Sequence, residues 1–131
     1  MRLRQSLRQA LEAAAARSRR SLADVIHELL DEAVRLRQCP GIYFADEPSG
    51  RTAKIGGTGL GVWEVLRDYG TDQDADRLRK AFHWLSQAQI TAALMYYGRY
   101  RDEVQAEIDA NAGLTPEAIE QQYPGLVRFA R

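Results

Sequence analysis

The stretch IYFADEPSGRTAKIGGTGLGVWEVLRDY, residues 42–69, decides the fold of this chain. It opens with an aromatic and β-branched run, passes through a Pro-Ser-Gly loop and continues in a second short extended run. This order predicts a β-hairpin over residues 42–55. Glycines then let the backbone turn tightly into an amphipathic helix that begins near Val62. Because the patterns on both sides are helical, the sequence predicts a mainly α fold interrupted by one hairpin.

A glycine-rich segment between a strand and a helix can cradle phosphate groups, so residues 56–61 must be tested for that use. In Gly57-Thr58-Gly59-Leu60-Gly61 the third glycine comes one residue too early for a dinucleotide fingerprint, and no Gly-Lys-Ser/Thr ending follows. A doubly wound sheet would also need several strand–turn–helix units, and the pattern offers one. We expect these glycines to be structural.

Composition narrows the class of protein. The 131 residues are 45% hydrophobic and 27% charged with a formal net charge of +0, which is typical of a soluble domain without a global attraction to nucleic acid. One cysteine and two distant histidines lead us to expect no disulfide, metal or cofactor. The sequence has no apolar span or signal core, so we expect a cytoplasmic protein without membrane association. The acids cluster at helix starts and on polar faces, and we expect no enzyme.

The first 38 residues predict a pair of helices. Leucine and alanine recur at helical spacing over residues 4–17. After a basic turn, Ser21 is placed to cap a second helix, which carries one continuous apolar stripe and stops before Pro40. This pair resembles the helical part of a ribbon-helix-helix DNA-binding protein, which dimerises through an N-terminal strand. Only residues 1–3 remain for that strand, so either the ribbon is lost or the recorded start lies inside a longer gene.

Residues 39–110 predict the hairpin followed by three helices. The first covers residues 62–69, and Thr71-Asp72-Gln73-Asp74 is placed to cap the second, whose apolar side includes Leu78, Ala81, Phe82, Trp84 and Leu85. Ser86 and Gln89 form a capping box that opens the longest helix. Its buried side is expected to hold Ile90, Ala93, Leu94, Tyr97, Val104 and Ile108, and its other face carries Gln87, Thr91, Met95 and Arg99.

Three helices with short polar turns fit a homeodomain-like helix-turn-helix unit, and they fit a plain three-helix bundle equally well. In the first case the helix opening at Ser86 enters the DNA groove. Gln87, Thr91 and Arg99 are then the residues suited to base edges and phosphates. In the N-terminal pair, Arg17, Arg19 and Arg20 are the expected phosphate contacts. We expect DNA binding to need a homodimer, because paired half-sites multiply the few basic contacts of each unit.

Several motifs together resemble the small VapB-type antitoxins that carry a homeodomain-like domain of unknown function. The resemblance covers residues 5–110 and rests on Pro40-Gly41-Ile42-Tyr43-Phe44, the Pro-Ser-Gly loop, Ile55-x-Gly57-Thr58-x-Leu60-x-Val62-Trp63-Glu64 and Ile90-x-x-Ala93-Leu94-x-Tyr96-Tyr97. It implies an antitoxin that binds and neutralises a PIN-like ribonuclease toxin and represses its own operon by binding operator DNA. A stand-alone helix-turn-helix regulator and a protein-interaction module without DNA binding remain open as alternatives.

The C-terminal tail, residues 111–131, lies beyond the motifs of that resemblance. Thr115-Pro116-Glu117 predicts a short helix, which needs a partner to be stable in water. A PIN-like site is a metal-holding cluster of carboxylates, to which arginine forks are suited. The residues expected to contact the toxin are Ile119, Tyr123, Leu126, Val127, Arg128, Phe129 and Arg131. The alternative is that the tail packs on its own domain.

Overall fold

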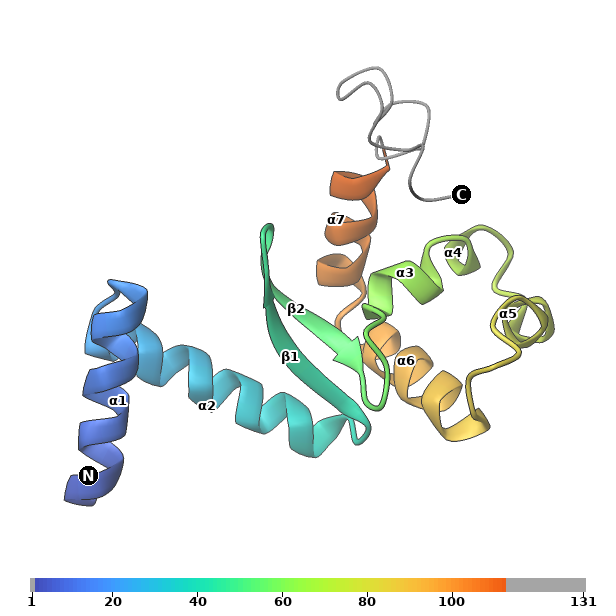
Figure 1. Ribbon diagram of the computed structural model, residues 1–131. Coiled ribbons are helices and arrows are strands. Elements are labelled where there is room, and N and C mark those ends of the chain that lie inside the picture. Colours follow the sequence, from blue (N-terminus) through green and yellow to red (C-terminus); the bar gives the residue numbers. More distant parts are fainter. Residues whose placement is uncertain (1, 113–131) are drawn as a thin grey trace, which may run out of the picture. The chain divides into compact units, whose positions relative to one another are not determined.

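The computed structural model describes residues 2–112 of the chain. These residues are mainly helical and contain one two-stranded antiparallel hairpin, as the sequence predicts (Figure 1). The chain divides between Pro40 and Gly41 into two compact units.

The first unit is a pair of helices, α1 (Gln5–Ser18) and α2 (Leu22–Gln38). Arg19 ends α1 with a φ of 55°, in the left-handed region. The predicted cap of α2 is confirmed, because the Ser21 hydroxyl accepts a hydrogen bond from the backbone N–H of Asp24 at 3.0 Å. Leu11, Ala15 and Val25 form the small core of this unit. Residues 2–4 contain no strand.

The second unit begins with β1 (Ile42–Glu47) and β2 (Gly50–Ile55), which pair antiparallel. The predicted hairpin is confirmed, but its connection is shorter than the expected Pro-Ser-Gly loop. Glu47 faces Gly50, so only Pro48 and Ser49 lie outside the ladder. Gly50 follows them with a φ of 122°, a conformation that only glycine adopts easily.

Between the hairpin and residue 112, the last residue described, the chain forms four helices and a further short turn of helix. They are α3 (Val62–Leu66), α4 (Tyr69–Asp72), α5 (Ala75–Ala81), α6 (Gln87–Arg99) and α7 (Arg101–Asn111). The expected single helix over residues 62–69 is therefore wrong, since α3 and α4 are separate. The cap predicted from Thr71-Asp72-Gln73-Asp74 is confirmed at its last residue. The Asp74 carboxylate caps α5 by accepting hydrogen bonds from the N–H groups of Asp76 and Arg77 at 3.0 and 3.2 Å.

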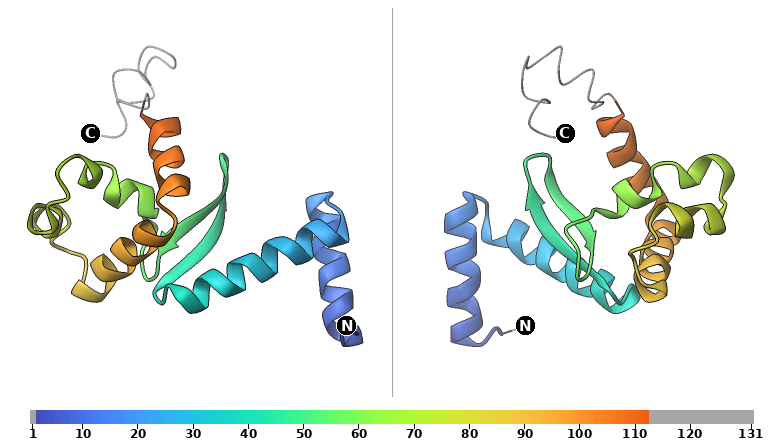
Figure 2. Two further views of the ribbon diagram at one scale, coloured as in Figure 1. Left: turned by 180° about the vertical axis from the view of Figure 1, so that it is seen from behind. Right: turned by 45° about the vertical axis from the view of Figure 1, so that its right-hand side comes forward.

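The longest predicted helix is broken in two at Tyr100, which has a non-helical ψ of 44°. The left view of Figure 2 shows α7 turning away from the direction of α6. Both helices contact α3, which has five residues. In one straight helix Ile90 and Ile108 would lie about 27 Å apart at 1.5 Å per residue, too far for so short a helix to bridge. The bend lets the fully buried Val104 join the core around Val65 and Leu66.

Candidate functional site

The start of α6 is fixed to the rest of the second unit by Gln89. The predicted capping box is present: the Ser86 hydroxyl accepts from the N–H of Gln89 at 3.1 Å, and Gln89 Oε1 accepts from the N–H of Ser86 at 2.8 Å. Gln89 Nε2 also donates to the carbonyl oxygen of Gly56 at 3.1 Å. One side chain therefore joins the first turn of α6 to the glycine-rich turn after β2.

The glycine-rich turn is held by its own hydrogen bonds. The Thr58 hydroxyl donates to the carbonyl oxygen of Ile55 at 2.8 Å and accepts from the N–H of Leu60 at 3.0 Å. The Tyr43 hydroxyl donates to the carbonyl oxygen of Thr58 at 2.6 Å. Gly57 has a φ of 80°, and a Cβ atom there would lie 3.2 Å from Gln89 Nε2. The conformation of this turn therefore helps to set the position of the first turn of α6.

The inner face of α6 is buried. Ile90, Ala93 and Tyr97 face the core as predicted, whereas Leu94 is half-buried. The sequence analysis did not include Tyr96 among the residues expected on the buried side of this helix. Tyr96 is fully buried and donates a hydrogen bond to Glu103 of α7. Its ring also meets that of Phe44 edge-on, with 6.2 Å between centroids. A signal was present in the pattern, because Tyr96 follows Ile90 and Ala93 at helical spacing.

The outer face of α6 carries Gln87, Thr91, Met95 and Arg99, and all four side chains are exposed. They follow one another at intervals of four residues, which places them along one side of the helix. Three of the six residues that we expect to contact DNA are in this row. It offers one amide, one hydroxyl and one guanidinium, and these groups can hydrogen-bond to base edges and phosphates.

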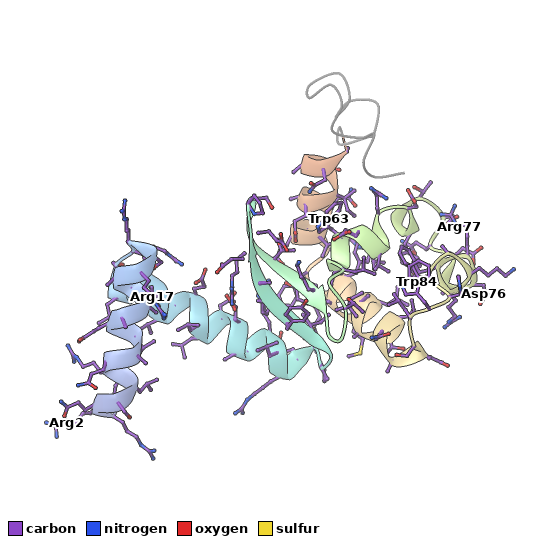
Figure 3. The ribbon with its side chains drawn as sticks, in the orientation of Figure 1. Arg2, Arg17, Trp63, Asp76, Arg77 and Trp84 are labelled. Carbon is purple, nitrogen blue, oxygen red and sulfur yellow. The ribbon has the colours of Figure 1, made fainter. Side chains whose placement is uncertain are left out.

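The other three expected DNA contacts, Arg17, Arg19 and Arg20, are exposed around the turn between α1 and α2. They belong to the first unit, whereas Gln87, Thr91 and Arg99 belong to the second. Arg20 is partly engaged, because its guanidinium pairs with Glu28 at 2.9 Å. Arg17, labelled in Figure 3, is at the end of α1.

The expectation that Trp84 belongs to the apolar side of a helix is wrong. Because α5 ends at Ala81, Trp84 lies in the turn before α6, where 61% of it is exposed. The Trp84 ring, labelled in Figure 3, lies beside the rings of Phe82 and His83, with centroids 5.4 and 5.3 Å away. Met95, in the second half of α6, is a further exposed apolar side chain, with 45% of it exposed.

A groove of about 450 Å³ lies on the second unit, lined by Glu47, Lys54, Trp63, Glu64 and Asn111 among others. Lys54 forms an ion pair with Glu47 across the hairpin, and this hydrogen-bonded partner raises the pKa of the lysine. The groove also holds the carboxylate of Glu64, which accepts a hydrogen bond from the N–H of Gly61 at 3.0 Å, and the half-exposed ring of Trp63, labelled in Figure 3.

Glu107 of α7 has an unusual environment for a carboxyl group. It is half-buried and bonded to Thr52 of β2. Burial, with a smaller contribution from the Glu103 carboxylate, raises the pKa of Glu107 to about 7, although the Thr52 hydrogen bond acts in the opposite direction.

Within residues 2–112 no three histidine, cysteine or acidic side chains gather as metal ligands would. In the same range no helix combines the length and apolar character needed to cross a bilayer. The residues expected to contact the toxin, Ile119 to Arg131, lie outside the described residues. No family model, curated protein or solved structure matches this chain.

Proposed function

We propose that this chain is the antitoxin of a type II toxin–antitoxin module. It binds and neutralises a PIN-like ribonuclease toxin, and as a homodimer it binds operator DNA and represses its own operon. In this proposal α3, α5 and α6 form a homeodomain-like helix-turn-helix unit with α6 in the major groove. The helices α1 and α2 take the part of a ribbon-helix-helix pair.

The DNA-binding half is supported by one observation, the exposed row of Gln87, Thr91 and Arg99 on a helix whose opposite face is buried. The capping box and the bond from Gln89 to Gly56 hold the first turn of α6 in place. A recognition helix needs both properties, because its side chains must reach base edges from a fixed position. The toxin-binding half is supported by the family resemblance and by the composition of the tail.

Fluorescence anisotropy with a duplex from the region upstream of the chain's own gene tests the DNA-binding half. The double variant Gln87→Ala/Thr91→Ala should lose tenfold or more in affinity for this duplex, since one good base contact contributes about 1–3 kcal/mol. Its weak binding to random DNA should not change, because affinity for random DNA depends on contacts to phosphates. Gln105→Ala, an exposed glutamine on α7, is the control. Equal affinity of the double variant and the wild type would refute the role of α6.

A protein-interaction module is the second candidate. The exposed Trp84 and Met95 favour it, because tryptophan and methionine are enriched at protein interfaces. The formal net charge of +0 also favours it, because affinity for DNA depends largely on neutralised phosphates. If this candidate is correct, Trp84→Ala abolishes capture of the protein encoded by the neighbouring gene, and the wild type binds no upstream DNA at low salt.

A further inference from the structure

The groove on the second unit has an aromatic side chain in its wall. This is the half-exposed Trp63, the second residue of α3. The Cδ1 and Nε1 atoms of its ring lie against Gly61, since a Cβ atom at Gly61 would come within 2.9 Å of both. The ring is therefore held beside the turn that precedes α3. An open indole face attracts a positive charge, because the electron density of the ring gives that face a negative potential.

The charged side chains that line the groove sum to a charge of −1, since two carboxylates face one ammonium group. Glu47 and Lys54 form an ion pair, and Lys54 Nζ also donates to the carbonyl oxygen of Gly59 at 3.4 Å. Glu64 is the second carboxylate. Its Oε1 accepts from the N–H of Gly61 at 3.0 Å, and no described residue donates to its Oε2. One negative charge and one free carboxylate oxygen thus remain for a ligand.

Asn111, the last residue of α7, adds a neutral acceptor to the same groove. Its Nδ2 donates to the carbonyl oxygen of Glu107 at 2.7 Å, and no described residue donates to its Oδ1. Lys54, the one basic side chain among the lining residues, already has two acceptors. The groove is therefore matched by a ligand that carries positive charge and donates hydrogen bonds. A guanidinium group does both, since its planar fork bonds to oxygen acceptors while its flat face stacks on an aromatic ring.

We propose that this groove is a binding site for a guanidinium group, which stacks on Trp63 and donates to Oε2 of Glu64 and Oδ1 of Asn111. Two sources share this chemistry: a separate molecule that carries the group, and the arginines within residues 113–131 of the same chain. The site uses neither α6 nor the turn between α1 and α2. It is thus independent of the proposed function, and a failure of DNA binding leaves it standing.

Fluorescence titration of the full chain tests the site in a Trp84→Phe background, in which Trp63 is the only tryptophan. The probe is Nα-acetyl-arginine amide, with an expected dissociation constant on the order of 1 mM for so few contacts. Nα-acetyl-citrulline amide has nearly the same shape without the charge, and it should bind at least about tenfold more weakly. Equal binding of the two compounds, or no saturable change with the arginine probe, would overturn the proposal.

Two substitutions in the lining change its charge in opposite directions. Glu64→Gln should weaken binding of the arginine probe at least about tenfold, while the amide oxygen keeps an acceptor for the Gly61 N–H at the start of α3. Lys54→Met should strengthen binding by a few fold, because it removes a positive charge from the groove. The matched control is Asp76→Asn, which neutralises an exposed carboxylate of α5 outside the lining. Unchanged affinity in both lining variants would overturn the proposal.

NMR chemical shifts of the wild-type chain check the location without the Trp84 substitution. The probe should move the indole N–H signal of Trp63 and the side-chain amide signals of Asn111, and shifts confined to other residues would overturn the assignment. Arg128→Gln/Arg131→Gln separates the two sources. Tighter probe binding in this variant would mean that the chain's own arginines occupy the groove, and unchanged binding would mean that the ligand is a separate molecule. Either result supports a guanidinium site.

Discussion

Gln89 Nε2 donates a hydrogen bond to the carbonyl oxygen of Gly56, 33 residues earlier in the chain, at 3.1 Å. The same side chain closes the capping box with Ser86. Gln89 is therefore the residue through which the hairpin and its glycine turn set the position of α6. This relationship makes the stability of the turn and the placement of the candidate DNA-binding face depend on each other.

Gln89→Ala should lower the free energy of unfolding by about 1–2 kcal/mol, because it removes one half of a capping box and one bond between distant segments. Urea unfolding followed by circular dichroism measures this loss. Gln87→Ala, two residues earlier and fully on the exposed face, should change stability by less than about 0.5 kcal/mol. Equal effects of the two substitutions would show that the bond to Gly56 contributes nothing measurable.

Gly57→Ala should destabilise the chain by at least about 1 kcal/mol. The residue has a φ of 80°, and a Cβ atom there would lie 3.2 Å from Gln89 Nε2. Gly59→Ala is a matched control in the same turn, because a Cβ atom at position 59 has no neighbour within 4 Å. Thermal unfolding of both variants checks the prediction. It is contradicted if the two midpoints fall together.

The environment of Glu107 predicts a pH dependence of stability. Its pKa is about 7 in the folded chain against an ordinary value of 4.5, so the folded state keeps a proton that the unfolded state has released between these values. Stability from this group is therefore present below about pH 4.5 and is lost as the pH rises through 7. Glu107→Gln should remove that loss.

Because Glu107 is only half-buried, solvent screening limits the effect to on the order of 1 kcal/mol. Urea unfolding at pH 4 and pH 8 should show that Glu107→Gln is more stable than the wild type at pH 8 and close to it at pH 4. The same substitution at the exposed Glu12 serves as the control. A gain that is equal at both pH values would refute the proposed titration.

Arg17→Ala/Arg19→Ala/Arg20→Ala should weaken binding to every DNA sequence alike and flatten the dependence of affinity on salt, as expected for phosphate contacts. Arg20 should contribute least of the three, because it already pairs with Glu28. The control removes three exposed arginines from the second unit, Arg67, Arg79 and Arg101. Anisotropy titrations at several salt concentrations measure both quantities. Unchanged affinity of the first variant at moderate salt would mean that its arginines are ordinary solvated surface.

Deletion of residues 112–131 should reduce neutralisation of the toxin while DNA binding and helicity persist. The reason is that the tail carries apolar anchors together with Arg128 and Arg131, which suit a carboxylate-lined nuclease site. The assay compares RNA cleavage by the neighbouring gene's product with the full and shortened chains. Full inhibition of the toxin by the shortened chain would refute this role of the tail. Loss of both toxin inhibition and DNA binding would show that the tail packs on its own domain.

The sequence by itself determined the elements that depend only on residues close together in the chain. The hairpin over residues 42–55, the Ser21 cap and the capping box of Ser86 and Gln89 were all predictable, because the residues that make these features are neighbours along the chain. The exposed row of Gln87, Thr91, Met95 and Arg99 followed from helical spacing alone. A local pattern sufficed in each case.

Only the tertiary structure decided where helices break and which apolar residues stay outside. Tyr100 ends α6 so that α3 can pack against both α6 and α7. This packing involves α3, which lies far from Tyr100 in the sequence, so the residues around Tyr100 do not predict the break. Trp84 and three leucines of α2, Leu29, Leu30 and Leu36, have the side chains of a core, and yet they are exposed. The physical reason is that periodicity reports which face of an element is apolar, whereas burial depends on whether another element is available to cover that face.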